Sequence, residues 1–600
     1  MKERKDIDAK YKWDLSVIYA NEESFKAEYS ECEKMISSFG RHEKTMLKSA
    51  EGLLSAITDL NNIERVIEKL WQYASLNYAT DTSNNAFQSM SGKMRNLAVT
   101  AGSASWFFIP YIQRIDDATL DAWFAECEEL KKYKRMIHKA RREREHTLSD
   151  ECERLMAKMD DCLGGNDETR SLLANADLKF GKIKGEDGKM HELTDTNYVP
   201  FLMSSDRRVR QAAFRTLYKT YAQFGNTLSS LYNCHVKEAV TVARVRGYKN
   251  SITASTFRDE VTPEIYNNLI KSVNNNLAPL YDYYELKREV LGLDKLHLYD
   301  VYAPLVGSFD KQYSYEEAVE EVLKTAEVLG EEYYSTLKSG LLERGWVDVY
   351  PSRGKRGGAF SSGCPDTEPY ILLNYNGSYD NVSTLAHEAG HSMHSYFSIK
   401  YNEPHETQYT IFVAEVASTV NELLMAHRRL AEAVSDEEKL YILNQLMETY
   451  KGTLYRQTMF AQFERDMHAL AEKGEPLTFD LVSKKYYRIV KKYFGPRVAC
   501  DKQIAYEWLR IPHFYSSFYV YKYATCISAA SAIVKRIESE GEKYINKYIS
   551  FLKCGDNRSP LDSLLVAEID MRDPAVVMGA VEDFAACVAQ FREIYNKIKK

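Results

Sequence analysis

The sequence predicts a mainly α-helical protein, and three observations support that fold class. Apolar residues recur at helical spacing through most of the 600 residues, with only 14 prolines to interrupt them. Runs typical of β-strands are confined to residues 177–181 with the turn at Gly185 and Gly188, and to residues 369–377. The chain contains no internal repeat and no low-complexity linker. We therefore expect helical lobes in close contact, not domains joined by flexible linkers.

Helical periodicity is interrupted near Pro110 and near Pro200, which divides the chain into three regions. We expect an N-terminal helical region over residues 1–110 and a second helical lobe segment with a short hairpin over residues 111–200. The third region, residues 201–600, is expected to be the catalytic domain because it carries the motifs described below. A chain of this length is ample for a large buried core.

Charge and composition limit the classes of partner. The formal net charge is −7 and basic residues are interspersed with acids, which argues against nucleic acid as the main partner. The N-terminus lacks the apolar region of a secretory signal, and no stretch approaches the length of an apolar membrane span. The ten cysteines, among them Cys127, Cys152, Cys162 and Cys364, show no CxxC spacing. We therefore expect a cytoplasmic protein with reduced thiols and no membrane partner, and the oligomeric state is left open.

His387-Glu388-Ala389-Gly390-His391 is the most informative segment of the chain. Residues four apart lie on one face of an α-helix, so both imidazoles can reach a single metal ion. Glu388 is rotated by about 100° from His387, which directs its carboxylate toward a water on the metal instead of the metal itself. This pattern is typical of zinc peptidases, in which the glutamate is the general base. The competing interpretation is a buried helix whose histidines only satisfy hydrogen bonds.

The segment around this motif is predicted to be helical. No proline occurs between Asn381 and Pro404, and Gly390 permits a neighbouring backbone to approach closely. Apolar residues keep close to a helical period at Val382, Leu385, Ala386, Ala389, Met393, Tyr396 and Phe397. The helix can therefore bury the rest of its surface in a core while it presents both histidines.

A third metal ligand distinguishes the classes of zinc enzyme. In one class another histidine lies six residues after the second motif histidine, but Phe397 holds that position here. The other solution is a carboxylate on a second helix, which is predicted to begin near Tyr409. Glu415 is embedded among the apolar residues of that helix, where an unpaired carboxylate is costly unless it binds a metal. We predict Glu415 as the third ligand, while Glu422 either hydrogen-bonds a ligand histidine or is an ordinary partly exposed acid.

These residues resemble oligoendopeptidase F, within the wider thimet oligopeptidase group. The zinc motif followed by Phe412-Val-Ala-Glu415-Val-Ala-Ser-Thr carries the resemblance. Further segments extend it over essentially the whole chain: Tyr11-Lys-Trp-Asp-Leu-Ser, Asn175-Ala-Asp-Leu-Lys-Phe-Gly, Arg244-Val-Arg-Gly-Tyr-Lys-Asn-Ser and Ile511-Pro-His-Phe-Tyr-Ser-Ser-Phe-Tyr-Val-Tyr-Lys-Tyr-Ala. The resemblance implies two helical lobes around a deep substrate channel, with one Zn²⁺ per chain at its floor and a small β-sheet beside the zinc helix. Such a channel would admit short peptides and exclude folded proteins.

A late run of aromatic residues supplies hydrogen-bond donors. Peptide hydrolysis builds negative charge on the former carbonyl oxygen, which an imidazole or a phenol can stabilise. In a helix Tyr519 and Tyr523 share a face, while Tyr521 points elsewhere. The resemblance implies His513 and Tyr523 as transition-state donors and Tyr519 as a substrate-binding residue, although the tyrosine spacing leaves open which phenol donates. A tyrosine stripe is also a common packing feature, and packing is the interpretation we favour for Tyr521.

A glycine-rich segment that includes Gly357 and Gly358 precedes the predicted strand at 369–377. An extended peptide could pair with the edge of such a strand through main-chain hydrogen bonds. The resemblance also implies that the glycine-rich loop contacts substrate. The alternative is a hairpin that only packs. A phosphate loop is excluded because the GxxxxGK[ST] order and the following helix are missing.

The sequence thus predicts a zinc endopeptidase that cleaves short oligopeptides, with Glu388 as general base. A zinc carboxypeptidase is the first alternative, and it would need a cation such as Arg510 or Arg497 to bind the substrate carboxylate. The second alternative is a non-catalytic, peptide-binding helical scaffold in which the metal is structural. A closed structural zinc site commonly has four protein ligands, often including cysteine, and no cysteine lies near the motif.

Overall fold

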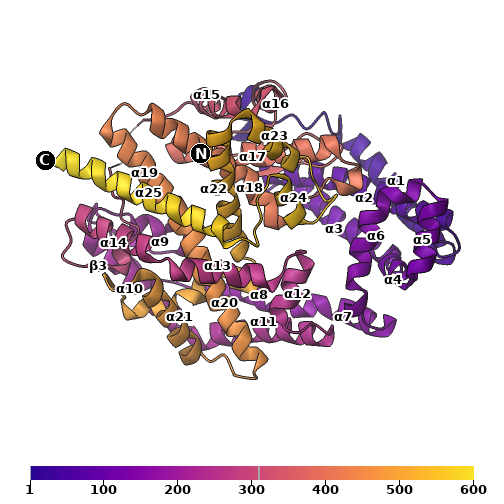
Figure 1. The fold of residues 1–600 in the computed structure, drawn as a ribbon, viewed down its shortest axis with the longest axis horizontal. Coiled ribbons are helices and arrows are strands. Elements are labelled where there is room, and N and C mark those ends of the chain that lie inside the picture. Colours follow the sequence, from indigo (N-terminus) through magenta and orange to yellow (C-terminus); the bar gives the residue numbers. More distant parts are fainter. Residues whose placement is uncertain (1, 308–310, 600) are drawn as a thin grey trace. The chain divides into compact units, whose positions relative to one another are not determined.

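The structure, a computed structural model, describes residues 2–307 and 311–599. The side chains of residues 157, 158 and 160–162 lie outside the described part, and with them the predicted free thiol of Cys162. Helices make up 72% of the chain and the sheets are small, which confirms the prediction of a mainly α fold (Figure 1). The chain forms two compact units, each assembled from three separate stretches.

Unit 1 comprises Met1–Thr147, Lys311–Met425 and Ile533–Glu568. Its helices are α1 (Glu22–Phe39), α2 (Ala50–Thr80), α3 (Asn85–Ala104), α4 (Phe108–Arg114), α5 (Asp117–Glu126), α6 (Lys134–Arg142), α15 (Tyr315–Ala326), α16 (Glu331–Leu342), α17 (Tyr379–Tyr401), α23 (Glu542–Leu552) and α24 (Pro560–Val566). Its strands are β4 (Val347–Asp348), β5 (Phe360–Ser362) and β6 (Tyr370–Leu372). Two of the five passages of the chain between the units lie inside helices, α18 (Ile411–Glu432) and α22 (Tyr521–Glu540).

Unit 2 comprises Leu148–Asp310, Ala426–Ala532 and Ile569–Lys600. Its helices are α7 (Asp150–Leu163), α8 (Gly165–Leu172), α9 (Asp195–Leu202), α10 (Arg207–Gln223), α11 (Gly225–Val245), α12 (Ser251–Arg258), α13 (Pro263–Asn275), α14 (Ala278–Val290), α19 (Asp436–Tyr450), α20 (Arg456–Glu472), α21 (Phe479–Phe494) and α25 (Pro574–Lys599). Its strands are β1 (Lys182–Lys184), β2 (Met190–Glu192), β3 (Leu296–His297) and β7 (Val498–Ala499).

The core of unit 1 joins the N-terminal helices to the small sheet. α2 buries Leu53, Ile57 and Leu60 at helical spacing and packs against α1 and α3. Tyr370 and Leu372 of β6 belong to the same apolar cluster. Burying one such side chain completely stabilises the fold by about 1.5–3 kcal/mol. The N-terminal helices therefore hold in place the sheet whose strand β5 lies against α17.

The sheet has the strand order β4-β6-β5, with β6 at its centre. β6 pairs in parallel with β4 and antiparallel with β5, and its three residues, 370–372, are fully buried. The prediction that the 369–377 run offers a free edge to a peptide is therefore wrong. A continuously apolar run is typical of a strand covered on both faces. Its place in the middle of the sheet comes from pairing with β4 and β5, which lie elsewhere in the sequence. The two edge strands of this sheet are β4 and β5, and β5 packs against α17.

The predicted hairpin forms in unit 2, but it begins later than expected. β1 and β2 pair antiparallel on either side of the turn that contains Gly185 and Gly188. Gly188 has φ +76°, a backbone conformation that favours glycine. Asp177, where the strand was expected to start, instead ends a π-helical turn over Leu173–Asp177.

Pro110 lies within α4 and Pro200 within α9, so each proline sits inside a short helix. The compact units do not follow the sequence in order, because each returns to a stretch more than 100 residues away. The three-region division at 1–110, 111–200 and 201–600 therefore describes segments of the chain and stays a prediction.

One helix among the described residues, α25, is long and apolar enough to cross a membrane by length and composition. This corrects the expectation that no stretch reaches that length. Its buried residues form one stripe: Val577, Ala580, Val581, Phe584, Cys587, Val588 and Phe591. The helix packs against α13, α14 and α19 of unit 2. Packing in the core of unit 2 accounts for the apolar stripe.

Candidate active site

The zinc motif lies in the middle of α17, as the sequence predicted. Ser378 caps the helix by accepting a hydrogen bond from the backbone N–H of Asn381. His387 and His391 follow on one face, and their Nε2 atoms are 3.1 Å apart. Both rings are partly buried, with 28% and 19% of the side-chain surface exposed. Helical spacing alone thus directs two nitrogen ligands at one point.

Gly390 sets how closely the next helix approaches. A Cβ atom at this position would lie 2.6 Å from the backbone oxygen of Ala417 and 2.6 Å from Cα of Ser418, both on α18. Asn421 adds a polar link, because its side-chain N–H group donates to the carbonyl oxygen of Ala386 at 3.2 Å. The absence of a side chain at Gly390 therefore lets α18 bring its residues within reach of the two histidines.

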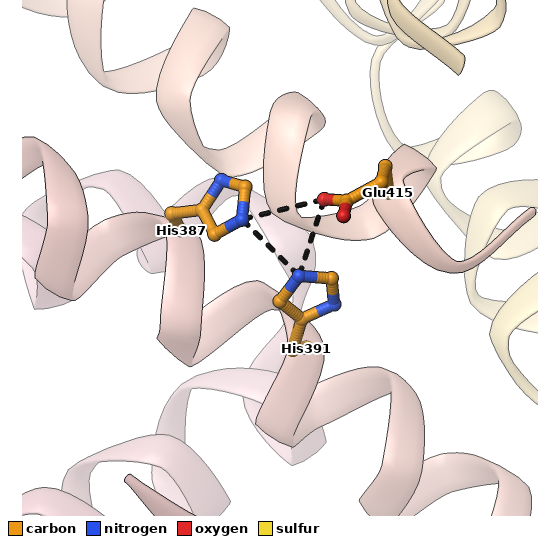
Figure 2. Close-up of side chains that lie close together, drawn as sticks. All are labelled: His387, His391 and Glu415. Atoms are coloured by element: carbon orange, nitrogen blue, oxygen red, sulfur yellow. Dashed lines mark hydrogen bonds and ion pairs between the residues drawn. The ribbon is translucent and has the colours of Figure 1, made fainter. Parts of the chain in front are cut away.

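Glu415 on α18 completes a triangle of ligand atoms (Figure 2). Its Oε2 lies 3.3 Å from Nε2 of His387 and 3.3 Å from Nε2 of His391. A tetrahedral zinc ion with bonds of about 2.0–2.1 Å requires neighbouring ligand atoms about 3.3 Å apart. The three residues therefore fit a metal ion in donor type and in spacing, and they are the one His/Cys/Asp/Glu cluster of this kind among the described residues.

Glu422 occupies the position that the hydrogen-bonding interpretation predicted. Its Oε1 pairs with Nδ1 of His387, on the opposite side of the ring from the ligand triangle. A proton held at Nδ1 leaves the lone pair of Nε2 free for a metal. Burial opposes protonation of this ring, yet hydrogen bonds to Glu415 and Glu422 hold the pKa of His387 well above its usual value. The two carboxylates around the His387 ring thus favour a positive charge at this position.

Glu388 lies beside the first histidine and is 6% exposed. Burial raises the pKa of its carboxyl group above the usual value. A dication at the neighbouring ligand atoms would act in the opposite direction and favour the carboxylate. The position suits a group that takes up a proton and releases it again, which is the task of a general base.

The glycine-rich segment leads into the edge strand β5. Ser361 of β5 hydrogen-bonds Ser392 of α17, with 2.8 Å between the two Oγ atoms. The carbonyl oxygen of Gly358 accepts a hydrogen bond from the side chain of Asn374 at 2.8 Å. Gly358 has φ +81°, and an added Cβ at Gly357 or Gly358 would meet no atom within 4 Å. A backbone hydrogen bond therefore anchors the loop, and the space on the side where a Cβ atom would lie is open.

The predicted donors lie in unit 2, whereas the candidate metal ligands lie in unit 1. His513, Tyr519 and Tyr523 form one cluster, with ring centroids 6.2 Å apart for His513–Tyr519, 6.1 Å for His513–Tyr523 and 5.5 Å for Tyr519–Tyr523. Tyr521 is buried against Tyr266, and its hydroxyl contacts Asp259. The preference for a packing role at Tyr521 is confirmed.

The two candidate cations for a carboxylate clamp have different surroundings. The guanidinium of Arg510 pairs with Asp195 at 2.9 Å and covers the ring of Tyr198. Arg497 is exposed, next to Pro496 and β7. Arg510 is therefore already paired with an acid, whereas Arg497 is exposed to solvent.

Sequence reasoning missed two residues that orient the site. Ser418 donates a hydrogen bond to Oε2 of Glu415 at 3.2 Å, and Asn421 accepts one from the hydroxyl of Tyr333 at 3.0 Å. Both are buried polar residues on α18. Their signal was a polar residue at a buried position of an apolar helix, the same signal that selected Glu415.

The sequence matches known peptidases along its whole length. The profile described as peptidase family M3 matches residues 201–582, and that described as oligopeptidase F matches residues 112–180. Oligopeptidase PepF of Bacillus subtilis is 40% identical over 598 residues, covering 100% of this chain and 89% of the relative. An oligoendopeptidase F homolog of Borreliella burgdorferi is 38% identical, covering 99% of this chain and 100% of the relative.

Solved structures agree in fold. Oligoendopeptidase-F from Enterococcus faecium superposes with a TM-score of 0.76 at 32% identity, covering 96% of this chain and 99% of that chain. A putative peptidase from Chlamydophila abortus gives a TM-score of 0.88 at 33% identity, covering 98% and 100%. The chain therefore belongs to peptidase family M3, whose members are metal-dependent, and within it to the oligopeptidase F group. It is a metalloendopeptidase that acts on oligopeptides.

Proposed function

We propose that this peptidase uses Zn²⁺ and hydrolyses internal bonds of short oligopeptides in the cytoplasm. The observation that carries the proposal is the triangle of His387, His391 and Glu415, whose ligand atoms are 3.1–3.3 Å apart. Two nitrogen ligands and one carboxylate are a common set for catalytic zinc, and a set of three leaves one position for water or substrate. The nine described cysteines are free thiols, which suits a reducing compartment.

Glu388 has the role of general base in the proposed reaction. Bound Zn²⁺ supplies a Lewis acid that makes a water more acidic and polarises the peptide carbonyl. Glu388 accepts the proton of the attacking water and delivers it to the leaving amine. Glu422 keeps the proton of His387 at Nδ1 throughout, so that Nε2 stays available as a ligand atom.

His513 and Tyr523 donate hydrogen bonds to the oxyanion that forms at the former carbonyl oxygen. Burial lowers the pKa of His513, so its ring is neutral near pH 7 and donates through one N–H group. Tyr519, Gly357 and Gly358 bind the substrate, the glycines through their exposed backbone.

Replacing Glu388 by Gln tests the proposed base. Glu388→Gln keeps the size of the side chain but cannot take up a proton, so turnover of a quenched fluorescent peptide should fall by about 10³-fold or more. Metal content measured by mass spectrometry should stay at one Zn²⁺ per chain. A chelator should abolish the wild-type activity, and added Zn²⁺ should restore it. Full activity in Glu388→Gln would contradict the mechanism.

Two alternatives give different outcomes with the same reagents. A carboxypeptidase would cleave peptides with a free C-terminus and spare those with a blocked one, whereas the proposed endopeptidase should cleave both at internal bonds. A non-catalytic scaffold would bind peptides and leave them intact. Mapping the products of a mixed peptide library, with and without chelator, separates the three.

A further inference from the structure

The loop that carries the proposed donors has an unusual backbone at Phe518. This residue has φ +58°, in the left-handed region that residues other than glycine rarely adopt. Such a conformation persists where the surrounding structure holds it. Phe518 lies between His513 and Tyr519 in the sequence, so its conformation decides how those two side chains are directed.

Glu464 on α20 holds the backbone of Phe518. Its Oε1 accepts a hydrogen bond from the N–H group of Phe518 at 2.6 Å. The carboxyl group is completely buried, and its second oxygen has no hydrogen-bond partner among the described residues. Burial raises the pKa of Glu464 to about 8.

A carboxyl group in this position is costly for the fold. Burying a polar group with one oxygen unsatisfied is unfavourable, and an apolar side chain of similar volume would fill the same space without that cost. Glu464 accepts a backbone hydrogen bond from Phe518, and the nearby hydroxyl of Tyr266 also favours its charged form. The hydrogen bond to the loop backbone is a specific contact that an apolar side chain at this position would not make.

Other contacts reinforce the same turn from the helices of unit 2. The ring of His468, one turn along α20, lies 4.4 Å from the ring of Phe518. Ser517 is held twice: Nε2 of His235 on α11 is 3.1 Å from its Oγ, and Ser255 on α12 donates to its carbonyl oxygen at 3.3 Å. Three helices, α11, α12 and α20, thus hold residues 517 and 518.

The start of the loop is fixed separately. Arg170 on α8 is 4% exposed and donates a hydrogen bond to the carbonyl oxygen of Arg510 at 2.7 Å. The loop is therefore held at residue 510 and again at residues 517 and 518. His513 lies between these anchors, and Tyr519 and Tyr523 follow the second anchor.

We propose that Glu464 is a positioning residue for peptide hydrolysis: its hydrogen bond to Phe518 fixes the turn that keeps His513, Tyr519 and Tyr523 in one cluster. The inference rests on the roles proposed above for those three side chains. Glu464 itself touches neither substrate nor metal, and acts only through the loop.

Two variants of Glu464 test the proposal. Glu464→Met keeps the volume but removes the acceptor, whereas Glu464→Gln keeps an acceptor oxygen. In Glu464→Met, kcat should fall by about ten- to a hundredfold, with a smaller change in KM, because donors displaced from the oxyanion act mainly on the transition state. Glu464→Gln should restore most of kcat. Thr458→Val is the matched control, since it removes a buried hydrogen bond that stays within the same helical segment.

Hydrogen–deuterium exchange with residue-level resolution reads the loop directly. The amide of Phe518 should be protected in the wild type, and it should exchange at least about tenfold faster in Glu464→Met than in Glu464→Gln. The wild-type measurement decides the matter even if Glu464→Met does not fold, because an unprotected Phe518 amide overturns the proposal.

The failures of the two proposals are distinguishable. A wild-type chain that cleaves no peptide contradicts the proposed function. An active wild type together with unchanged kcat and unchanged Phe518 exchange in Glu464→Met contradicts the positioning role alone. Equal losses of kcat in Glu464→Met and Glu464→Gln also contradict the positioning role, because the acceptor oxygen that Gln retains should preserve most of kcat.

Discussion

At the scale of single residues, the two nitrogen atoms of His387 have separate partners. Nδ1 pairs with Glu422, and Nε2 faces His391 and Glu415. The carboxylate of Glu422 therefore holds the proton at Nδ1, and Nε2 keeps its lone pair. The sequence left Glu422 between two interpretations because helical spacing does not say which neighbour a side chain meets across an interface.

Glu422→Ala should weaken Zn²⁺ binding by about 10- to 100-fold, because the ring of His387 then loses the partner that fixes its tautomer and orientation. Glu422→Gln, which retains an acceptor oxygen, should lie between Ala and the wild type. Competition with a chromophoric chelator measures the affinity. Glu432→Gln on the same helix is the control, since Glu432 pairs with Arg428 at the surface. If Glu422→Ala and Glu432→Gln bind Zn²⁺ with equal affinity, Glu422 does not have this role.

At the scale of elements, the site depends on the contact between α17 and α18. α17 supplies two ligands by its own periodicity, but the third ligand comes from a helix that must approach closely. Gly390 allows that approach, because any side chain there would meet the backbone of Ala417 and Ser418. The sequence predicted both helices and identified Gly390 as a place of close approach. It could not predict that β6 is a central strand, because pairing partners far apart in sequence decide strand order.

Gly390→Ala should separate the two helices. The added methyl group meets backbone atoms at 2.6 Å, so α18 must move, at a cost of about 1–3 kcal/mol in the free energy of unfolding. Zn²⁺ affinity should fall as well, because Glu415 moves with its helix. Gly92→Ala in α3 is the control: its Cβ meets nothing within 4 Å, and a helical alanine should be neutral or stabilising by up to about 1 kcal/mol. Denaturant unfolding and metal titration of both variants give the comparison, and equal behaviour would count against the packing argument.

At the scale of the whole molecule, each compact unit carries a different part of the proposed chemistry. Unit 1 holds the candidate metal ligands and the three-stranded sheet, and unit 2 holds the proposed aromatic donors and the buried Glu464. The stability of unit 2 should depend on pH through Glu464, whose pKa rises from 4.5 to about 8 on folding because of burial. Because the folded state binds this proton more tightly than the unfolded state, the proton stabilises the folded chain. The stabilisation is fully present below pH 4.5 and is lost as the pH rises to about 8.

The free energy of unfolding of the wild type should therefore fall relative to Glu464→Gln between pH 4.5 and pH 8. The slope should be at most about 1.4 kcal/mol per pH unit, the value for one proton. The difference between the two proteins removes the contributions of groups that titrate alike in both. Denaturant unfolding at a series of pH values measures it, and a constant difference across this range would show that Glu464 ionises normally in the folded chain.

The sequence by itself determined the helical class and the family, and it identified the metal motif and the candidate third ligand, because each of these follows from local spacing or from a run of neighbouring residues. Glu415 could be selected since an acid within an apolar helix needs a partner wherever the helix lies. Only the tertiary structure decided that Glu422 meets His387, that Ser418 and Asn421 orient the site, and that Glu464 holds the turn at Phe518. These contacts join different helices. The relative placement of those helices depends on the packing of the whole core, which the spacing of residues along the chain does not predict.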